Sequence, residues 1–148
     1  MNSHPYLRAF LAGAFVPTLI LPLMLTGFIL LRLVFQVPVP IERILIFPMA
    51  LVPSLWAVWN MLWISWHPRT HVSIGAHGAL LPFLLVPGGA FVGTSLGFLN
   101  LEASGVTIVH SYQIPYLVIA PFFFGALAVY YLAWKYIVGF VNRTLGIA

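Results

Sequence analysis

The sequence predicts an all-α integral membrane protein: a single domain over residues 1–148, with four kinked transmembrane helices in one bundle and short loops. Apolar residues make up 62% of the chain and charged residues only 5%, whereas soluble domains carry roughly 25% charged residues. Such a chain cannot cover its surface with polar groups, so lipid must be its solvent. Four apolar stretches reach the roughly 20 residues that crossing a bilayer requires: about 9–33, 43–65, 78–99 and 113–136.

Prolines occur in pairs, one pair in each apolar stretch, at 17/22, 48/53, 82/87 and 115/121. A proline inside a helix frees the carbonyl four residues earlier, and neighbouring groups must then satisfy that carbonyl. We therefore expect kinked spans. The regular spacing fits a duplicated helical hairpin. Unrelated helix-plus-loop units in a Pro-rich membrane protein would give a similar spacing, and this is the simpler interpretation.

Composition excludes several classes of function. The net charge of +4 is spread without any run of Lys or Arg, so we expect no nucleic-acid partner. The absence of Cys removes disulfides and thiolate chemistry. The two acidic residues fall in predicted loops, and no His lies at mid-span depth to hold a haem. The chain is predicted to be non-catalytic and without a cofactor.

The first span, 9–33, is predicted to be a retained helix. Its apolar run is longer than the roughly 7–15 residues of a signal-peptide core. The small residues 12–14 lie near the beginning of that run instead of after it. Arg32, near the end of the span, can extend its side chain to the interface.

The second span, 43–65, contains most of a tryptophan stripe. Trp56, Trp59, Trp63 and Trp66 lie within roughly an 80° arc of a helix. Trp63 and Trp66, near the helix end, are interpreted as interfacial anchors.

Trp56 and Trp59 lie deeper, where anchoring explains them less well. They are the candidate ligand-binding residues, with Asn60 as the polar group that would orient a ligand. Three alternatives stay open. The two tryptophans face lipid, or they pack against glycines of another span, or Asn60 makes an interhelical hydrogen bond. The last is the favoured interpretation of Asn60.

The polar stretch 67–77 is predicted to be a loop that carries His67, His71 and His77. His67 and His71 have the i, i+4 spacing of metal ligands on a helix. Pro68 weakens such a helix, and no carboxylate lies nearby to complete a site. Ordinary loop histidines are therefore the favoured interpretation, with a metal-binding or pH-sensing site as the alternative.

The third span, 78–99, contains Gly89, Gly93 and Gly97 at GxxxGxxxG spacing. Glycines at this spacing let two helix backbones approach closely. Packing within the bundle is the favoured role. Self-association is the second possibility, and close approach of a ligand is the third.

After the third span the β-branched segment 106–112 favours an extended backbone, and the fourth span, 113–136, follows. This span ends in Tyr130, Tyr131, Trp134, Lys135 and Tyr136, which is typical of an interfacial aromatic girdle. The sequence 142–144 is formally a glycosylation sequon, and the predicted topology leaves it inside.

Four spans place both termini and the 67–77 segment on one side of the membrane. That side holds four Lys or Arg residues and the other holds two. Because short cytoplasmic segments are enriched in Lys and Arg, both termini are predicted to be cytoplasmic. In a bacterium the protein would lie in the inner membrane.

These features favour a structural or accessory membrane subunit that acts through helix–helix contacts. Its expected partners are membrane lipids together with other membrane subunits or further copies of itself. A binder or carrier of a lipid or other uncharged hydrophobic molecule is the alternative, based on the Trp56 region. A metal- or pH-responsive membrane protein using the histidines is the third hypothesis.

Overall fold

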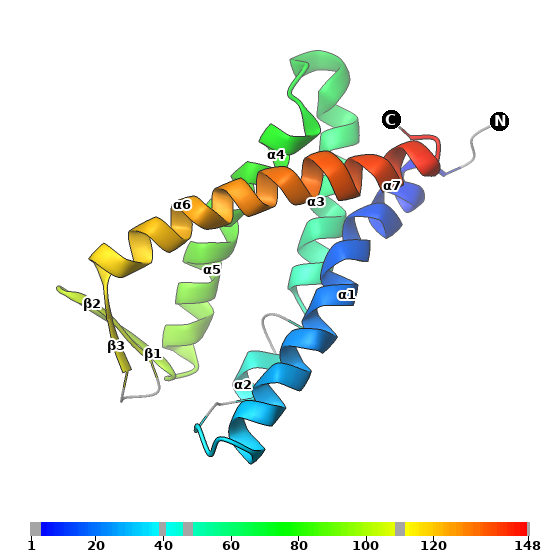
Figure 1. Ribbon diagram of the computed structural model, residues 1–148. Helices are drawn as coiled ribbons and strands as arrows, with labels where there is room; N and C mark the ends of the chain where they lie inside the picture. The colour runs from blue at the N-terminus through cyan, green and yellow to red at the C-terminus, as the bar shows by residue number, and fades with distance from the viewer. Residues whose placement is uncertain (1–3, 39–40, 46–48, 109–111, 148) are drawn as a thin grey trace.

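The structure is a computed structural model that describes residues 4–38, 41–45, 49–108 and 112–147. The fold is mostly helical, with one small sheet (Figure 1). In chain order the elements are α1 (Pro5–Leu33), α2 (Ile41–Ile44), α3 (Val52–Thr70), α4 (Ile74–Leu80), α5 (Pro82–Ser95), β1 (Leu99–Glu102), β2 (Gly105–Ile108), β3 (Tyr112–Pro115), α6 (Tyr116–Leu132), the π-helix η2 (Ala133–Val138) and α7 (Gly139–Thr144).

Among the described residues, three helical segments are long and apolar enough to cross a membrane. They are α1, the combined α4–α5 segment Ile74–Ser95, and the continuous α6–η2–α7 segment Tyr116–Thr144. The first and third have 29 residues each, or roughly 43 Å of helix. Because the hydrocarbon layer is about 30 Å thick, helices of this length fit it when tilted. These segments correspond to the predicted spans 9–33, 78–99 and 113–136.

The predicted second span, 43–65, is wrong in its bounds. The long helix here is α3, which begins nine residues later, with Pro53 in its first turn. Proline suits that position because its missing N–H has no partner there anyway. α3 is not one of the three apolar segments. Its polar residues, Asn60, His67 and Arg69 among them, explain the lower hydropathy. Pro48 lies outside the described residues.

The all-α prediction is also incomplete, because residues 99–115 form a three-stranded antiparallel sheet. The strand order is β1-β2-β3, with Leu101 paired to Val106 and Val106 paired to Ile114. The expected extended segment around Val106 is confirmed in β2. Gly97 ends the preceding helical region with a φ of 69°, a conformation that glycine adopts without steric cost. The sheet therefore includes the last residue of the predicted span 78–99 and the first three residues of the predicted span 113–136.

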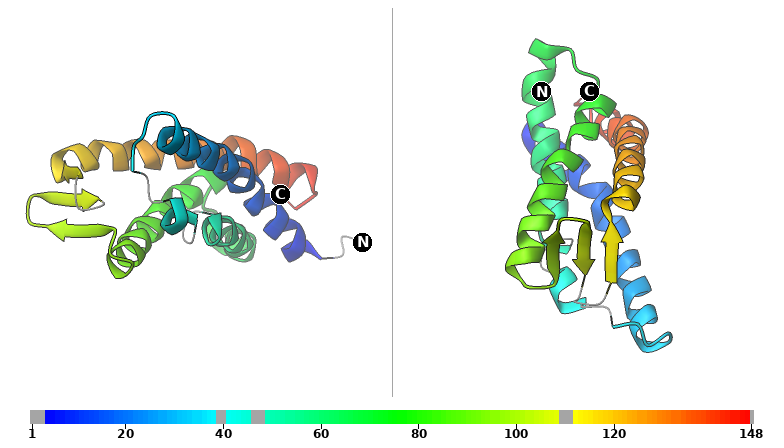
Figure 2. Two further views of the ribbon diagram at one scale, coloured as in Figure 1. Left: turned by 90° about the horizontal axis from the view of Figure 1, so that it is seen from below. Right: turned by 90° about the vertical axis from the view of Figure 1, so that its left-hand side faces the viewer.

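α1 leads away from the end that holds the N-terminus, α3 returns, the α4–α5 segment leads away again, and α6 crosses the other helices obliquely on its way back, so that the two termini lie close together (Figures 1 and 2). The sheet and the α1–α2 connection lie at the opposite end. At the terminal end, Nη1 of Arg8 donates to the carbonyl of Leu145 at 3.1 Å. At the sheet end, Arg32 and Glu42 form an exposed ion pair of 2.7 Å. The hydrogen bond from Arg32 holds the pKa of Glu42 below its ordinary value.

The core lies between the helices at the terminal end. Its buried residues come from α1, α3, the α4–α5 segment and η2, and they are Val16, Trp56, Leu81, Leu85, Trp134 and Val138. Two glycines permit the closest approaches between helices. A Cβ at Gly13 would lie 2.5 Å from the carbonyl oxygen of Trp56, and a Cβ at Gly78 would overlap the side chain of Trp134. Close packing through small residues therefore occurs, at Gly13 and Gly78.

The predicted aromatic girdle at 130–136 is divided between two environments. Nζ of Lys135 lies 5.5 Å from the ring centre of Tyr131 and 5.3 Å from that of Tyr136, which is a cation–π arrangement. Trp134 instead is fully buried, and Tyr130 packs against the core. The helix also continues beyond this group to Thr144, so the group does not mark the helix end.

Replacing Gly78 by Ala is expected to destabilise the protein, because the added methyl overlaps the buried Trp134 ring. Overpacking of this kind costs about 1–3 kcal/mol. The free energy of unfolding in mixed detergent micelles measures the effect. Gly27→Ala is the matched control, since a Cβ there meets nothing within 4 Å. Equal stabilities for the two variants would contradict the packing described.

Candidate functional site

Asn60 is fully buried and makes hydrogen bonds to two other helices. Its Nδ2 donates to the carbonyl of Ala9 in α1 at 2.8 Å and to Oδ1 of Asn142 in α7 at 2.8 Å. Nδ2 of Asn142 donates back to Oδ1 of Asn60 at 3.0 Å. The two amides thus form a reciprocal pair, and both side chains are buried. This geometry matches the interhelical interpretation of Asn60, since its amide hydrogens are already used.

No sequence pattern pairs Asn142 with Asn60. The sequence marks Asn142 only as the first residue of a glycosylation sequon. One available signal was its place after the apolar run 137–141, which is unusual for an amide. Its side-chain nitrogen is the atom that glycosylation would modify, and here that nitrogen is buried against Asn60. The folded chain therefore does not present this sequon.

Trp59 is paired with His77 of α4. Nε1 of Trp59 donates to the carbonyl of His77 at 2.9 Å, and Nε2 of His77 lies 2.8 Å from the carbonyl of Trp59. Because a carbonyl only accepts, Nε2 must carry the proton in this second bond. The two rings stack with centres 4.8 Å apart. Trp59 therefore joins α3 to α4.

The 67–77 segment is mostly helical, so the predicted loop is wrong. α3 extends to Thr70, and α4 begins after Ser73, whose side chain accepts from the N–H of Ala76 at 3.2 Å. His77 accordingly lies in α4, where it is 3% exposed. The turn is short because His71 ends α3 in the left-handed conformation, with a φ of 53°.

Trp63 and His67 organise the α3–α4 turn. Their rings stack with centres 4.7 Å apart, and Nε1 of Trp63 and Nδ1 of His67 each lie 3.2 Å from the carbonyl of Val72. Trp63 is buried, whereas Trp66 is 51% exposed. Of the two expected anchors, only Trp66 is placed with its ring outward. Within the described ranges, no three metal-ligating side chains come together.

The predicted glycine ridge does not form along one helix. α5 ends at Ser95, so Gly97 lies beyond it. A Cβ at Gly93 would lie 3.0 Å from Leu99 and 3.4 Å from Phe98, in the segment that follows the same helix. Gly93 thus allows the chain to fold back on itself. Gly89, in α5, is half-buried.

Trp56 lines a cavity of about 230 Å³ between α1, α3 and the α6–η2 helix. Val16, Pro17 and Ile20 border it from α1, Val52 and Trp56 from α3, and Tyr130 from α6. Trp56 itself is 5% exposed. We call this space the inner cavity. Trp56 also packs against the buried Trp134, with the two ring centres 5.3 Å apart.

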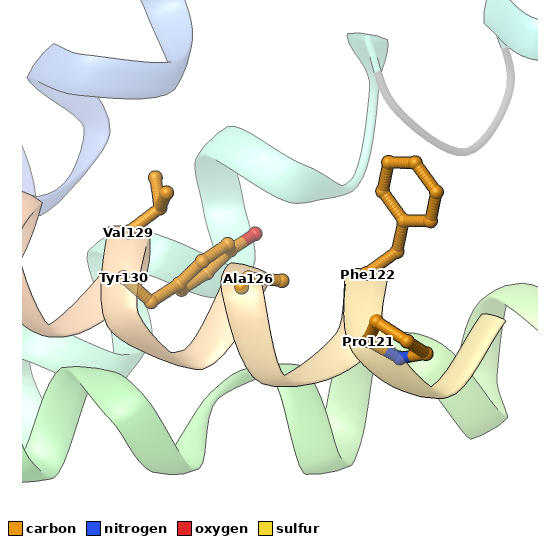
Figure 3. Close-up of a pocket in the computed structure, with 6 residues that line it drawn as sticks. Pro121, Phe122, Ala126, Val129 and Tyr130 are labelled. Carbon is orange, nitrogen blue, oxygen red and sulfur yellow. The ribbon is translucent and has the colours of Figure 1, made fainter. Parts of the chain in front are cut away.

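A second, open cavity of about 520 Å³ lies along α6 and meets the inner cavity at Val129 and Tyr130. Its other lining residues are Pro121, Phe122, Gly125 and Ala126, on the same helix (Figure 3). We call it the outer cavity, and the two together the α6 groove. None of the described residues that line the groove is acidic or basic.

Trp56 carries one polar atom without a hydrogen-bond partner among the described residues. Nε1 of Trp56 is buried and has no hydrogen-bond partner within the described part of the chain. The ring of Tyr130 lies 5.0 Å from the ring of Trp56, centre to centre. A buried donor left unpaired costs about 1–3 kcal/mol.

No family model, curated protein or solved structure matches this chain. Function is therefore inferred from the groove, the buried polar contacts and the helices that are long and apolar enough to cross a membrane.

Replacing Asn142 by Leu is expected to lower the free energy of unfolding, because it leaves the buried amide of Asn60 without its partner. The expected loss is about 1–3 kcal/mol. The double variant Asn60→Leu/Asn142→Leu should lose less than the sum of the two single losses. Unfolding in mixed micelles measures all three variants. Strict additivity would contradict the coupling that the hydrogen bonds imply.

Proposed function

We propose that this chain is a non-catalytic, multi-pass membrane protein that binds an uncharged hydrophobic molecule, such as one chain of a lipid, in the α6 groove. The observation that carries the proposal is the continuity of the groove. Its open outer part leads along α6 to an inner cavity with Trp56 and Tyr130 in its lining. The sequence indicated this class of function as the alternative hypothesis, through Trp56.

The dimensions of the groove favour a long, narrow ligand. Ligand pockets usually measure roughly 300–1,000 Å³, and the inner cavity alone, at about 230 Å³, is smaller than that. It has room for the end of a longer molecule. The outer cavity, at about 520 Å³, is an open surface along α6 on which the remainder would lie. A single flexible chain fits this shape better than a broad, rigid ring system.

The lining favours an uncharged ligand. A charged group placed in the groove would lose its hydration, and no acidic or basic residue among those lining the groove would compensate. Tyr130 carries the one hydroxyl among the described residues that line the groove, and it favours one acceptor, such as an ester or ketone oxygen, near the inner end. Trp59 and Asn60 support the site indirectly, by holding α3 in place.

An accessory subunit remains the second candidate function, and one observation favours it. No residue of α6 is buried, and Leu117, Phe122 and Phe124 are 86%, 76% and 68% exposed. Lipid can cover this surface, and so can a helix of another subunit or of a second copy. The glycines Gly89, Gly93 and Gly97 support this role less than the exposed face of α6 does.

The arrangement in the membrane is part of the proposal. We propose that α3 is the fourth membrane helix, packed against α1 through Gly13 and Asn60, and that both termini are cytoplasmic. The common position of the termini and the alternating helix directions support this arrangement. A helix with a buried amide is tolerated in a bilayer when neighbouring helices satisfy that amide, as they do for Asn60.

Filling the groove tests the binding function. Gly125→Leu places a side chain in the outer cavity, and we expect about tenfold weaker binding of palmitic acid methyl ester, which corresponds to about 1.4 kcal/mol. Native mass spectrometry of the protein released from detergent measures the bound ester across a titration.

Gly88→Leu is the matched control. Both glycines lie in apolar helices, and a Cβ at either one meets nothing within 4 Å. Gly88 is not among the residues that line the α6 groove. Binding to Gly125→Leu that equals binding to Gly88→Leu would contradict the groove as the site. It would leave the accessory role as the better account.

A further inference from the structure

The three-stranded sheet has one apolar face and one polar face. Residues paired across adjacent strands point to the same face, and successive residues of a strand point to opposite faces. The register places six apolar residues on one face: Leu99, Ile108 and Tyr112 in one row, and Leu101, Val106 and Ile114 in the other. The opposite face carries Asn100, Thr107 and Gln113 in one row, and Glu102, Gly105 and Pro115 in the other.

The polar face is held together by its own hydrogen bonds. The carboxylate of Glu102 accepts from Oγ1 of Thr107 at 2.6 Å and from Nε2 of Gln113 at 3.2 Å. Nε2 of Gln113 also donates to Oγ of Ser104 at 2.9 Å. Glu102, Ser104 and Gln113 are exposed. A carboxylate in such a position is stable facing water and unfavourable in hydrocarbon.

The apolar face is only partly covered by the rest of the chain. Leu101 is 57% exposed and Tyr112 is 53% exposed. Ile108, Tyr112 and Ile114 border an open cavity together with Val37 of the α1–α2 connection. Ile114 also borders a cavity with α6, at Val118 and Phe122 among others. This face therefore looks toward the membrane helices and leaves apolar side chains uncovered.

The connections of the sheet fix its depth. β1 begins four residues after α5 ends, and β3 leads directly into α6, so both ends of the sheet are tied to membrane helices. The sheet is open, with β1 and β3 as edges. Open sheet edges do not occur exposed to lipid within the hydrocarbon region, because a backbone group that is unsatisfied there costs several kcal/mol. The sheet must therefore lie outside the hydrocarbon layer, yet next to it.

We propose that this sheet lies flat in the membrane interface, with its apolar face against the acyl chains and its polar face in water. The partner of the apolar face is the lipid surface itself. Tyr112 and Tyr116 fit this depth, because tyrosine is enriched where hydrocarbon meets the headgroups. The proposal is independent of the α6 groove, and it holds whether or not the groove binds a ligand.

The chain contains no Cys, so single-cysteine variants give one defined labelling site. Leu101→Cys and Tyr112→Cys report on the apolar face, and Asn100→Cys and Gln113→Cys, their neighbours in sequence, report on the polar face. Each variant carries an environment-sensitive nitrobenzoxadiazole label and is reconstituted in phosphatidylcholine vesicles. Quenching by a spin-labelled phospholipid is compared with quenching by aqueous iodide.

We expect the labels at 101 and 112 to be quenched several-fold more by the lipid-borne quencher than by iodide, with the opposite order at 100 and 113. If Gln113→Cys disturbs the hydrogen bonds of the polar face, the comparison between positions 100 and 101 still tests the proposal. Iodide quenching of position 101 equal to that of position 100 would overturn the proposal. So would lipid quenching at all four positions, or a label at 101 that neither quencher reaches, which would indicate a protein partner on that face.

Discussion

The reciprocal hydrogen bonds between Asn60 and Asn142 are the interaction on which the rest of the fold depends. They join α3 to α7, and the bond from Asn60 to the carbonyl of Ala9 adds α1. In lipid no water is present to satisfy a polar group that loses its partner. This arrangement of the three helices is therefore favoured over any that separates the two amides. Trp56 lies one helical turn before Asn60, so the same contact sets its position beside Tyr130.

The helices converge at the end that carries these amides, and the space between them opens away from it. Apolar surface is continuous along this opening. Each cavity beside α6 shares a lining residue with the next one. The shared residues are Ile114 at the sheet, Phe122 in the middle of the row, and Tyr130 at the inner cavity. The helical part, Tyr116 to Ala133, covers roughly 26 Å. A hydrophobic molecule in the α6 groove would therefore run from the region of the interfacial sheet toward the closed, hydrogen-bonded end.

Composition and apolar run length predicted three helical segments that are long and apolar enough to cross a membrane, and the structure has helices there. The interhelical role of Asn60 was also predicted, since an amide in a membrane helix needs a partner. Its partner was not, because 82 residues separate Asn60 from Asn142 and no local pattern encodes that contact. Gly13 and Gly78 were missed for the same reason: each is recognisable only by the side chain or backbone opposite it. The sheet was missed because its strands have four residues each, too few to outweigh the neighbouring apolar runs.

Photo-crosslinking tests most directly whether the α6 groove is a binding site. A palmitate methyl ester with a diazirine near the end of its chain, added to the protein in vesicles, is activated by light, and its adducts are mapped by mass spectrometry. The account predicts adducts concentrated on the lining of the inner cavity, at Ile20, Trp56 and Tyr130, although Trp56 is almost entirely buried. Adducts distributed according to exposure, at Phe91 and Leu117 for example, with none on Trp56, would contradict it.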